Sequence, residues 1–254
     1  MSSQPPVEPG SQQTPPQGQV VVQAPSTRPL ATYALIAVCV LIYIVQYATQ
    51  SLLGVDVPAA YGLKVNDWII RGELWRLITP MFLHGSIYHI AFNMYALYQF
   101  GPALERYYGH KRFLVLYFLG GFAGNVASFA LTQAPSLGSS TAIFGLLGAE
   151  AVFIYQNRKF FGNRARQAIS QIVLVAVVNL VFGLSPGIDN WGHVGGLIGG
   201  TAFAWFAGPL LQVEGFFPNL NLVDNREERE VFLAACGVAL VFILLTGALI
   251  VTRQ

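Results

Sequence analysis

The chain has 254 residues, of which 54% are hydrophobic and only 10% are charged, and its formal net charge is +2. In soluble domains roughly a quarter of the residues are charged, so this composition excludes a water-soluble globular protein. The small net charge also gives no indication of a nucleic-acid partner. The composition predicts an all-α polytopic membrane protein.

The first 29 residues are rich in Pro, Gln and Ser. They cannot bury enough apolar surface to offset the loss of chain entropy, so the prediction for residues 1–29 is a disordered tail. This stretch contains no charged region followed by a short apolar core. A cleavable signal peptide is therefore not expected.

Apolar segments follow, separated by clusters of charges. Five are about as long as a membrane-crossing helix requires, at 30–49, 113–131, 169–184, 194–211 and 231–251. Two shorter segments, 89–100 and 141–155, contain polar or small residues that lipid-facing helices seldom tolerate, so both are expected to be interior helices. The prediction is a six-helix core over residues 30–211, then a cytoplasmic linker and a seventh transmembrane helix within residues 212–254.

The basic residues predict the orientation of these helices. One side of the membrane would receive ten Lys and Arg residues: Arg28, Arg106, Lys111, Arg112, Arg158, Lys159, Arg164, Arg166, Arg226 and Arg229. The other side would receive Lys64, Arg71, Arg76 and Arg253. The positive-inside rule then places the N-terminus in the cytoplasm and the C-terminus outside a cell membrane. The apolar residues of the first outer loop, residues 50–83, predict that this loop packs into the membrane interface.

Polar residues gather at the outer ends of three predicted helices. The second helix opens with His84, His89 and Asn93, the fourth with the sequence 138–141 (GSST), and the sixth with His193. All three helices run from outside to inside, so these groups lie at a similar depth. Any one of them is explained by a helix cap or a carbonyl hydrogen bond. Together they indicate function, because polar side chains are costly within a bilayer.

The set contains the groups that acyl transfer requires. Ser140 supplies a nucleophile and His193 a base. His89 and Asn93, with backbone N–H groups, supply donors for an oxyanion. The two cysteines, Cys39 and Cys236, lie in apolar segments and indicate neither a disulfide framework nor a metal site.

Small residues repeat on the helices that carry Ser140 and His193. Gly196, Gly200 and Ala204 recur at every fourth position on the face of His193, and the segment 141–149 has a similar stripe beside Ser140. Such stripes are sufficient for ordinary membrane packing. Here they also predict that the two helices approach closely enough for a Ser–His hydrogen bond.

The order of these motifs resembles that of the rhomboid family of intramembrane serine proteases, over about residues 71–205. The matching positions are Trp75-Arg76, His84…His89…Asn93, Glu105 in ALERYYG, Gly138-Ser139-Ser140-Thr141 and His193-Val194-Gly195-Gly196. The resemblance implies that Ser140 is the nucleophile, His193 the base, and His89 and Asn93 part of the oxyanion hole. It also implies that Phe144 stacks on the ring of His193. A seventh helix after a six-helix core is a known variation of the family.

The resemblance implies transmembrane protein substrates within the lipid bilayer and no metal or other cofactor. Three positions depart from the family pattern. Thr141 stands where glycine is commoner, Gly192 where alanine often precedes the histidine, and Glu150 where an apolar residue is usual.

Alternatives remain open. A catalytically inactive rhomboid-like protein that binds or escorts membrane clients would be expected to lack the serine or histidine, and both are present. A metalloenzyme using His84, His89 and His193 would be expected to show His-Glu-x-x-His, which the sequence lacks. The sequence shows no paired broken helices of the kind that transporters use, so it does not support a transporter. If the chain is a protease, Asp189 is expected in a loop over 189–192, nearer to water than to the imidazole, which predicts a Ser–His dyad.

Overall fold

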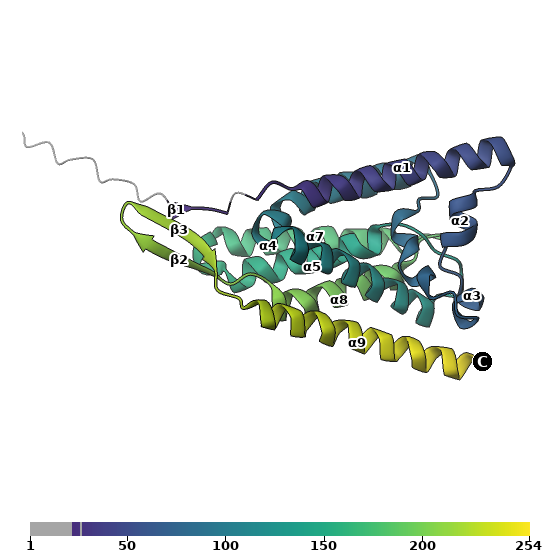
Figure 1. The fold of residues 1–254 in the computed structure, drawn as a ribbon. Helices are drawn as coiled ribbons and strands as arrows, with labels where there is room; N and C mark the ends of the chain where they lie inside the picture. Colours follow the sequence, from purple (N-terminus) through teal and green to yellow (C-terminus); the bar gives the residue numbers. More distant parts are fainter. Residues whose placement is uncertain (1–21, 26) are drawn as a thin grey trace, which may run out of the picture.

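The structure is a computed structural model that describes residues 22–25 and 27–254, and it is mostly helical (Figure 1). The longer helices are α1 (Leu30–Leu53), α4 (Ile87–Leu131), α5 (Ser140–Gln156), α7 (Arg164–Phe182), α8 (Asn190–Ala207) and α9 (Glu228–Arg253). By length and composition, α1, α4, α7 and α9 are suited to cross a membrane. The predicted disordered tail falls largely on residues 1–21 and 26, outside the described residues.

Helix α4 contains two of the predicted segments, because the chain turns within it at Gly109. This glycine has φ 70° and ψ 163°, a conformation that other residues rarely adopt. His89 from the first half and Asn125 from the second half line the same cavity. The two halves of α4 therefore run in opposite directions, and both of its ends lie beside that cavity.

The two short segments predicted to be interior helices have different outcomes. In α5 the prediction is confirmed, since the side chains from Thr141 to Ala149 and from Val152 to Ile154 are buried. In the first half of α4 it is wrong. This half continues from Ile87 to the turn at Gly109 and exposes one face, with Tyr88 74%, Phe92 72% and Tyr95 63% accessible. Asn93 is buried on the opposite, inner face, whereas the polar Gln99 is exposed beside Tyr95.

Helix α5 lies at the centre of the bundle and packs against α4 and α8 through glycines. A Cβ atom added to Gly196 would lie 2.0 Å from the Thr141 carbonyl oxygen, and one added to Gly200 would lie 2.2 Å from the Gly145 oxygen. No methyl group fits at these distances. The small-residue stripes therefore bring the backbones of α5 and α8 into direct contact, as the sequence predicted.

Replacing Gly200 with alanine is expected to force α5 and α8 apart, because the obstacle is backbone and not a movable side chain. Overpacking of this kind typically costs about 1–3 kcal/mol of stability. Thermal unfolding of the purified protein in detergent measures the loss. Gly237→Ala is the matched control, because no atom of residues 22–25 or 27–254 lies within 4 Å of its added methyl group. Equal midpoints for the two variants would contradict the packing role of Gly200.

The first loop is ordered as α2 (Val57–Gly62), α3 (Asn66–Ile70) and the 3-10 turns η1 (Leu74–Leu77) and η2 (Thr79–Phe82). Arg76 is buried and donates hydrogen bonds to the carbonyls of Leu63 at 2.8 Å and Ala60 at 3.0 Å. The indole Nε1 of Trp75 donates to the carbonyl of Tyr61 at 3.0 Å. These two residues hold the loop together and do not line the cavity that contains Ser140.

Glu105 lies away from Ser140, at the start of α1. Its buried carboxylate accepts hydrogen bonds from the backbone N–H groups of Ala31 and Thr32 and from the Thr32 hydroxyl. Nδ1 of His110 lies within hydrogen-bond distance of the same carboxylate. Glu105 therefore stabilises the free N–H groups at the first turn of α1, a role distant from the predicted chemistry.

A small sheet, absent from the all-α prediction, extends from the bundle at the end opposite α2 and α3 (Figure 1). Strands β2 (Leu211–Phe216) and β3 (Asn219–Asp224) form an antiparallel hairpin, and β1 (Val22–Gln23) pairs in parallel with β3. The hairpin occupies the first part of residues 212–254, for which a linker followed by a seventh transmembrane helix was predicted. Strand β1 lies within residues 1–29, so the disordered tail was predicted to extend too far along the chain.

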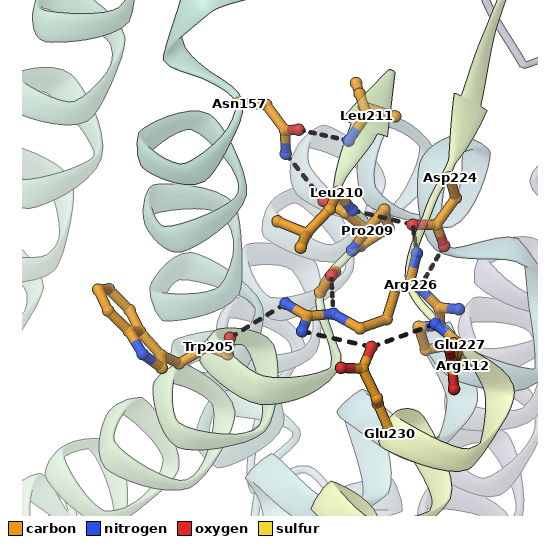
Figure 2. Close-up of polar contacts among 11 residues, drawn as sticks. Arg112, Asn157, Trp205, Pro209, Leu210, Leu211, Asp224, Arg226, Glu227 and Glu230 are labelled. Atoms are coloured by element: carbon orange, nitrogen blue, oxygen red, sulfur yellow. Dashed lines mark hydrogen bonds and ion pairs between the residues drawn. The ribbon is translucent and has the colours of Figure 1, made fainter. Parts of the chain in front are cut away.

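Hydrogen bonds join the base of this hairpin to the helices around it (Figure 2). Asp224 accepts from the backbone N–H of Leu210 and pairs with Arg112 of α4 at 2.7 Å. Arg226 donates to the carbonyl of Gly208, beyond the end of α8, and forms an ion pair with Glu230 at 3.6 Å. The hairpin is therefore fixed to α4, α8 and α9 at its base.

Candidate active site

Ser140 and His193 lie side by side where α5 and α8 begin. The hydroxyl Oγ of Ser140 is 2.9 Å from Nε2 of His193, within hydrogen-bond distance. The ring of His193 stacks on Phe144, one turn after Ser140, with centroids 4.4 Å apart and planes 10° from parallel. The close approach of α5 and α8 produces this geometry, because both side chains stand at the first turns of helices that touch.

The neighbouring serine has a different environment. Ser139 is completely buried, and its hydroxyl lies 3.3 Å from Nε2 of His84. It does not line the cavity that Ser140 lines. The backbone N–H of His84 donates to the side-chain oxygen of Gln46 in α1 at 3.0 Å, so this bond holds His84 in place next to Ser139.

His89, Asn93 and Gly138 lie around Ser140. Gly85 donates its N–H to Nδ1 of His89 at 3.4 Å, which favours the tautomer with a proton on Nε2. The amide of Asn93 donates one hydrogen to the His89 carbonyl at 3.1 Å, and its second hydrogen meets no acceptor in the described part of the chain. Gly138 has φ 128°, and a Cβ there would lie 2.7 Å from Nε2 of His89. Only glycine leaves room for the His89 ring at this point.

Asp189 holds the start of α8 and forms no hydrogen bond with the His193 ring. It accepts from the Gly192 N–H at 3.1 Å and the Thr132 hydroxyl at 3.0 Å, and also from the Ser128 hydroxyl. Nδ1 of His193 has no hydrogen-bond partner among the described residues. The predicted loop over 189–192 is corrected to a helix that begins at Asn190, with a half-buried Asp189 as its N-cap.

These groups line one cavity of about 670 Å³ between α4, α5, α7 and α8, at the end of the bundle where α5 and α8 begin. Asn125 of α4 and Asn179 of α7 also line it, and the sequence analysis missed both. The same signal that identified Asn93 would have identified them, since each is an amide within an apolar segment. Phe182 and Ile188 form an apolar part of the cavity wall.

Lys64 joins the first loop to the segment that leads into Ser140. Its completely buried ammonium donates to Asn66 Oδ1 at 3.0 Å and to the carbonyls of Thr132 at 2.8 Å and Ala134 at 3.0 Å. Its backbone also pairs with that of Ser136. Burial lowers the pKa of Lys64 to about 8. This connection fixes the chain shortly before the predicted nucleophile.

Two departures from the rhomboid pattern lie in contact with each other. A Cβ added to Gly192 would lie 3.1 Å from the Cγ2 methyl of Thr141, closer than ordinary van der Waals contact. The larger residue at 141 thus faces the smaller residue at 192. The third departure, Glu150, has a buried Oε2 without a partner among the described residues, and the structure does not explain it.

The three histidines of the metalloenzyme alternative do not form a metal site. Across the described ranges, no group of three His, Cys, Asp or Glu side chains is arranged to hold a metal ion. His193 pairs with Ser140, and His84 with Ser139.

Comparisons with known proteins give one family. A model of the Rhomboid domain matches residues 71–210 of this chain. The "Rhomboid protease GluP" of Bacillus subtilis (strain 168) is 42% identical over 216 residues, which are 85% of this chain and 40% of that protein. The "RHOMBOID-like protein 9, chloroplastic" of Arabidopsis thaliana is 38% identical, over 62% of this chain and 37% of that protein. The "Rhomboid-like protease 3" of Toxoplasma gondii is 34% identical, over 62% of this chain and 58% of that protein. The chain thus spans less than two thirds of each of these relatives.

Proposed function

The chain belongs to the rhomboid family, and from that membership we propose that it is a serine endopeptidase that cleaves peptide bonds within the transmembrane segments of other membrane proteins. The observation that carries the proposal is the 2.9 Å contact between Ser140 Oγ and His193 Nε2 at the wall of a cavity. A hydroxyl and an imidazole at this distance form a nucleophile and its base.

The proposed reaction begins with attack of Ser140 Oγ on the scissile carbonyl while Nε2 of His193 takes the hydroxyl proton. The carbonyl oxygen becomes an oxyanion, which accepts hydrogen bonds from the Ser140 N–H, from His89 Nε2 and from Asn93. The C–N bond then breaks, and His193 returns the proton to the leaving amine. Water, deprotonated by His193, hydrolyses the resulting ester and frees Ser140.

The test is cleavage of a panel of single-span membrane proteins by the purified protein in detergent. Wild type is expected to give fragments cut within the span, and Ser140→Ala none. Intact substrates with wild type would favour the second candidate, an inactive member of the family that binds clients. Fragments that persist with Ser140→Ala, or that disappear with a chelator, would contradict a serine mechanism.

The depth of the site leads to a prediction about substrates. A helix conceals its carbonyls in hydrogen bonds, so a substrate must unwind locally before Ser140 can attack. Gly and Pro favour unwinding because they cost a helix about 1 and 3 kcal/mol. Replacing the span of a cleaved substrate by a continuous Leu-rich helix is expected to abolish cleavage, measured as the initial rate. A rate unchanged from that of the original span would contradict the unwinding step.

We further propose a cell-membrane location with the N-terminus in the cytoplasm, supported by the distribution of Lys and Arg in the sequence. In this orientation the cavity opens toward the outer leaflet, and the three-stranded sheet lies at the cytoplasmic end.

A further inference from the structure

An apolar groove runs along the bundle between α5, α7 and α8, separate from the cavity of Ser140. Its volume is about 480 Å³, and its walls include Ala151, Ile172, Ala176, Leu197 and Trp205. Along α7 it extends from Ile169 to Leu180, which at 1.5 Å per residue is about 16 Å. That length is close to the apolar depth of one leaflet, about half of the 30 Å hydrocarbon core.

One end of the groove continues into a basic pocket. Tyr155 and Ile169 line both spaces, so the two are contiguous. Arg158, Lys159 and Arg166 line the pocket where α5 passes through the short helix α6 (Arg158–Phe161) into α7. Of the described carboxylates, none lies within ion-pair distance of these cations. The pocket therefore presents three uncompensated positive charges at the edge of the membrane-spanning region.

The dimensions of the groove restrict its occupant. A volume of about 480 Å³ spread over about 16 Å gives a channel about 6 Å wide. An α-helix with side chains is about 10–12 Å across and can lie only over the groove, whereas a single acyl chain fits within it. Helix α7 leaves most of its surface uncovered by the protein, so lipid reaches the groove directly.

Aromatic residues fix the junction between the groove and the pocket. The rings of Tyr155 and Trp205 stack with centroids 6.0 Å apart. The Trp205 carbonyl accepts hydrogen bonds from Gln156 and Arg226, and Figure 2 shows the indole pointing away from the hairpin junction. The guanidinium of Arg158 lies 4.9 Å from the ring of Tyr155. Tyr and Trp at this position are typical of a membrane–water interface.

We propose that this groove and pocket bind one anionic phospholipid, with its phosphate at Arg158, Lys159 and Arg166 and an acyl chain between α7 and α8. Charge complementarity selects the anionic headgroup, and basic pockets between transmembrane helices on the cytoplasmic side recognise such groups. The lipid would fill the space beside α7, the helix that also contributes Asn179 and Phe182 to the cavity of Ser140.

Native mass spectrometry of the whole protein, released from detergent after titration with lipid, tests this site without any cleavage assay. Phosphatidylglycerol is expected to bind at least about tenfold more tightly than phosphatidylcholine with the same chains, since each basic residue contributes about 1 kcal/mol of attraction. The variant R158Q/K159Q/R166Q is expected to lose this preference. Excess glycerol phosphate is expected not to displace the lipid.

The matched control is R106Q/K111Q/R229Q, which removes the same charge from exposed positions on the same predicted side of the membrane. It is expected to keep the preference, and an equal loss in both variants would overturn the site in favour of general attraction. Ala176→Phe fills the groove and keeps every charge, so it is expected to weaken binding of both lipids. Displacement by glycerol phosphate, or no preference in wild type, would also overturn the proposal.

Discussion

His193→Ala is expected to lose essentially all cleavage, while Asp189→Asn keeps a rate within about tenfold of wild type. Removal of the base of a serine hydrolase lowers kcat by about 10⁴–10⁶. In a triad the loss of the carboxylate alone lowers kcat by about 10⁴. Here the Asp189 oxygens bond to Gly192, Thr132 and Ser128, and Nδ1 of His193 has no bonded partner among the described residues.

Initial rates on one purified substrate measure both variants. Asp189→Asn is expected to unfold at a slightly lower temperature, because an amide NH₂ replaces the oxygen that accepts from Ser128 and the negative charge at the start of α8 is lost. The assays therefore run well below the unfolding midpoint of each variant. A fall of Asp189→Asn to the level of His193→Ala, in protein that remains folded, would show that the base has a carboxylate partner.

A fluorophosphonate probe is expected to react with Ser140 and not with the adjacent Ser139. Wild type and Ser139→Ala should be labelled, and Ser140→Ala should show only background. Ser140 lines the cavity and contacts the base, whereas Ser139 is buried against His84. In-gel fluorescence after a fixed incubation measures the difference.

Ser139→Ala also serves as the control for folding. It removes one buried hydrogen bond, worth about 1 kcal/mol, so its unfolding midpoint should fall slightly while labelling persists. Labelling retained in Ser140→Ala, or lost in Ser139→Ala that is still folded, would assign the nucleophile to the other serine.

Much of this site was predictable because membrane segments make polar residues conspicuous. Four residues stand out in apolar sequence: His89, Asn93, Ser140 and His193. Their helices run in the same direction, which predicted that the four side chains lie at a similar depth. The contact between α5 and α8 was predictable from Gly196 and Gly200, because only small residues at that spacing permit it.

Other features depend on contacts that sequence spacing does not encode. Asp189 caps α8 through the nearby Gly192 N–H, but its further hydrogen bonds come from Ser128 and Thr132, about 60 positions earlier, which approach it across the bundle. The burial of Lys64 likewise depends on carbonyls supplied by residues 132–134. The hairpin β2–β3 was missed because its alternating pattern lies between two strongly apolar segments and was assigned to a linker.

The facing pair Thr141 and Gly192 restricts the order in which this chain can change. Alanine at 192, the residue commoner in the family, would meet the Thr141 methyl at 3.1 Å. Consensus replacements commonly stabilise proteins, but here an added methyl at 192 is crowded on two sides, because the Asp189 carboxylate would also lie 3.1 Å away. Loss of the methyl at 141 therefore relieves only part of the crowding. The effects of substitutions at positions 141 and 192 therefore depend on each other. A chain with alanine at 192 that keeps Thr141 would be crowded beside His193.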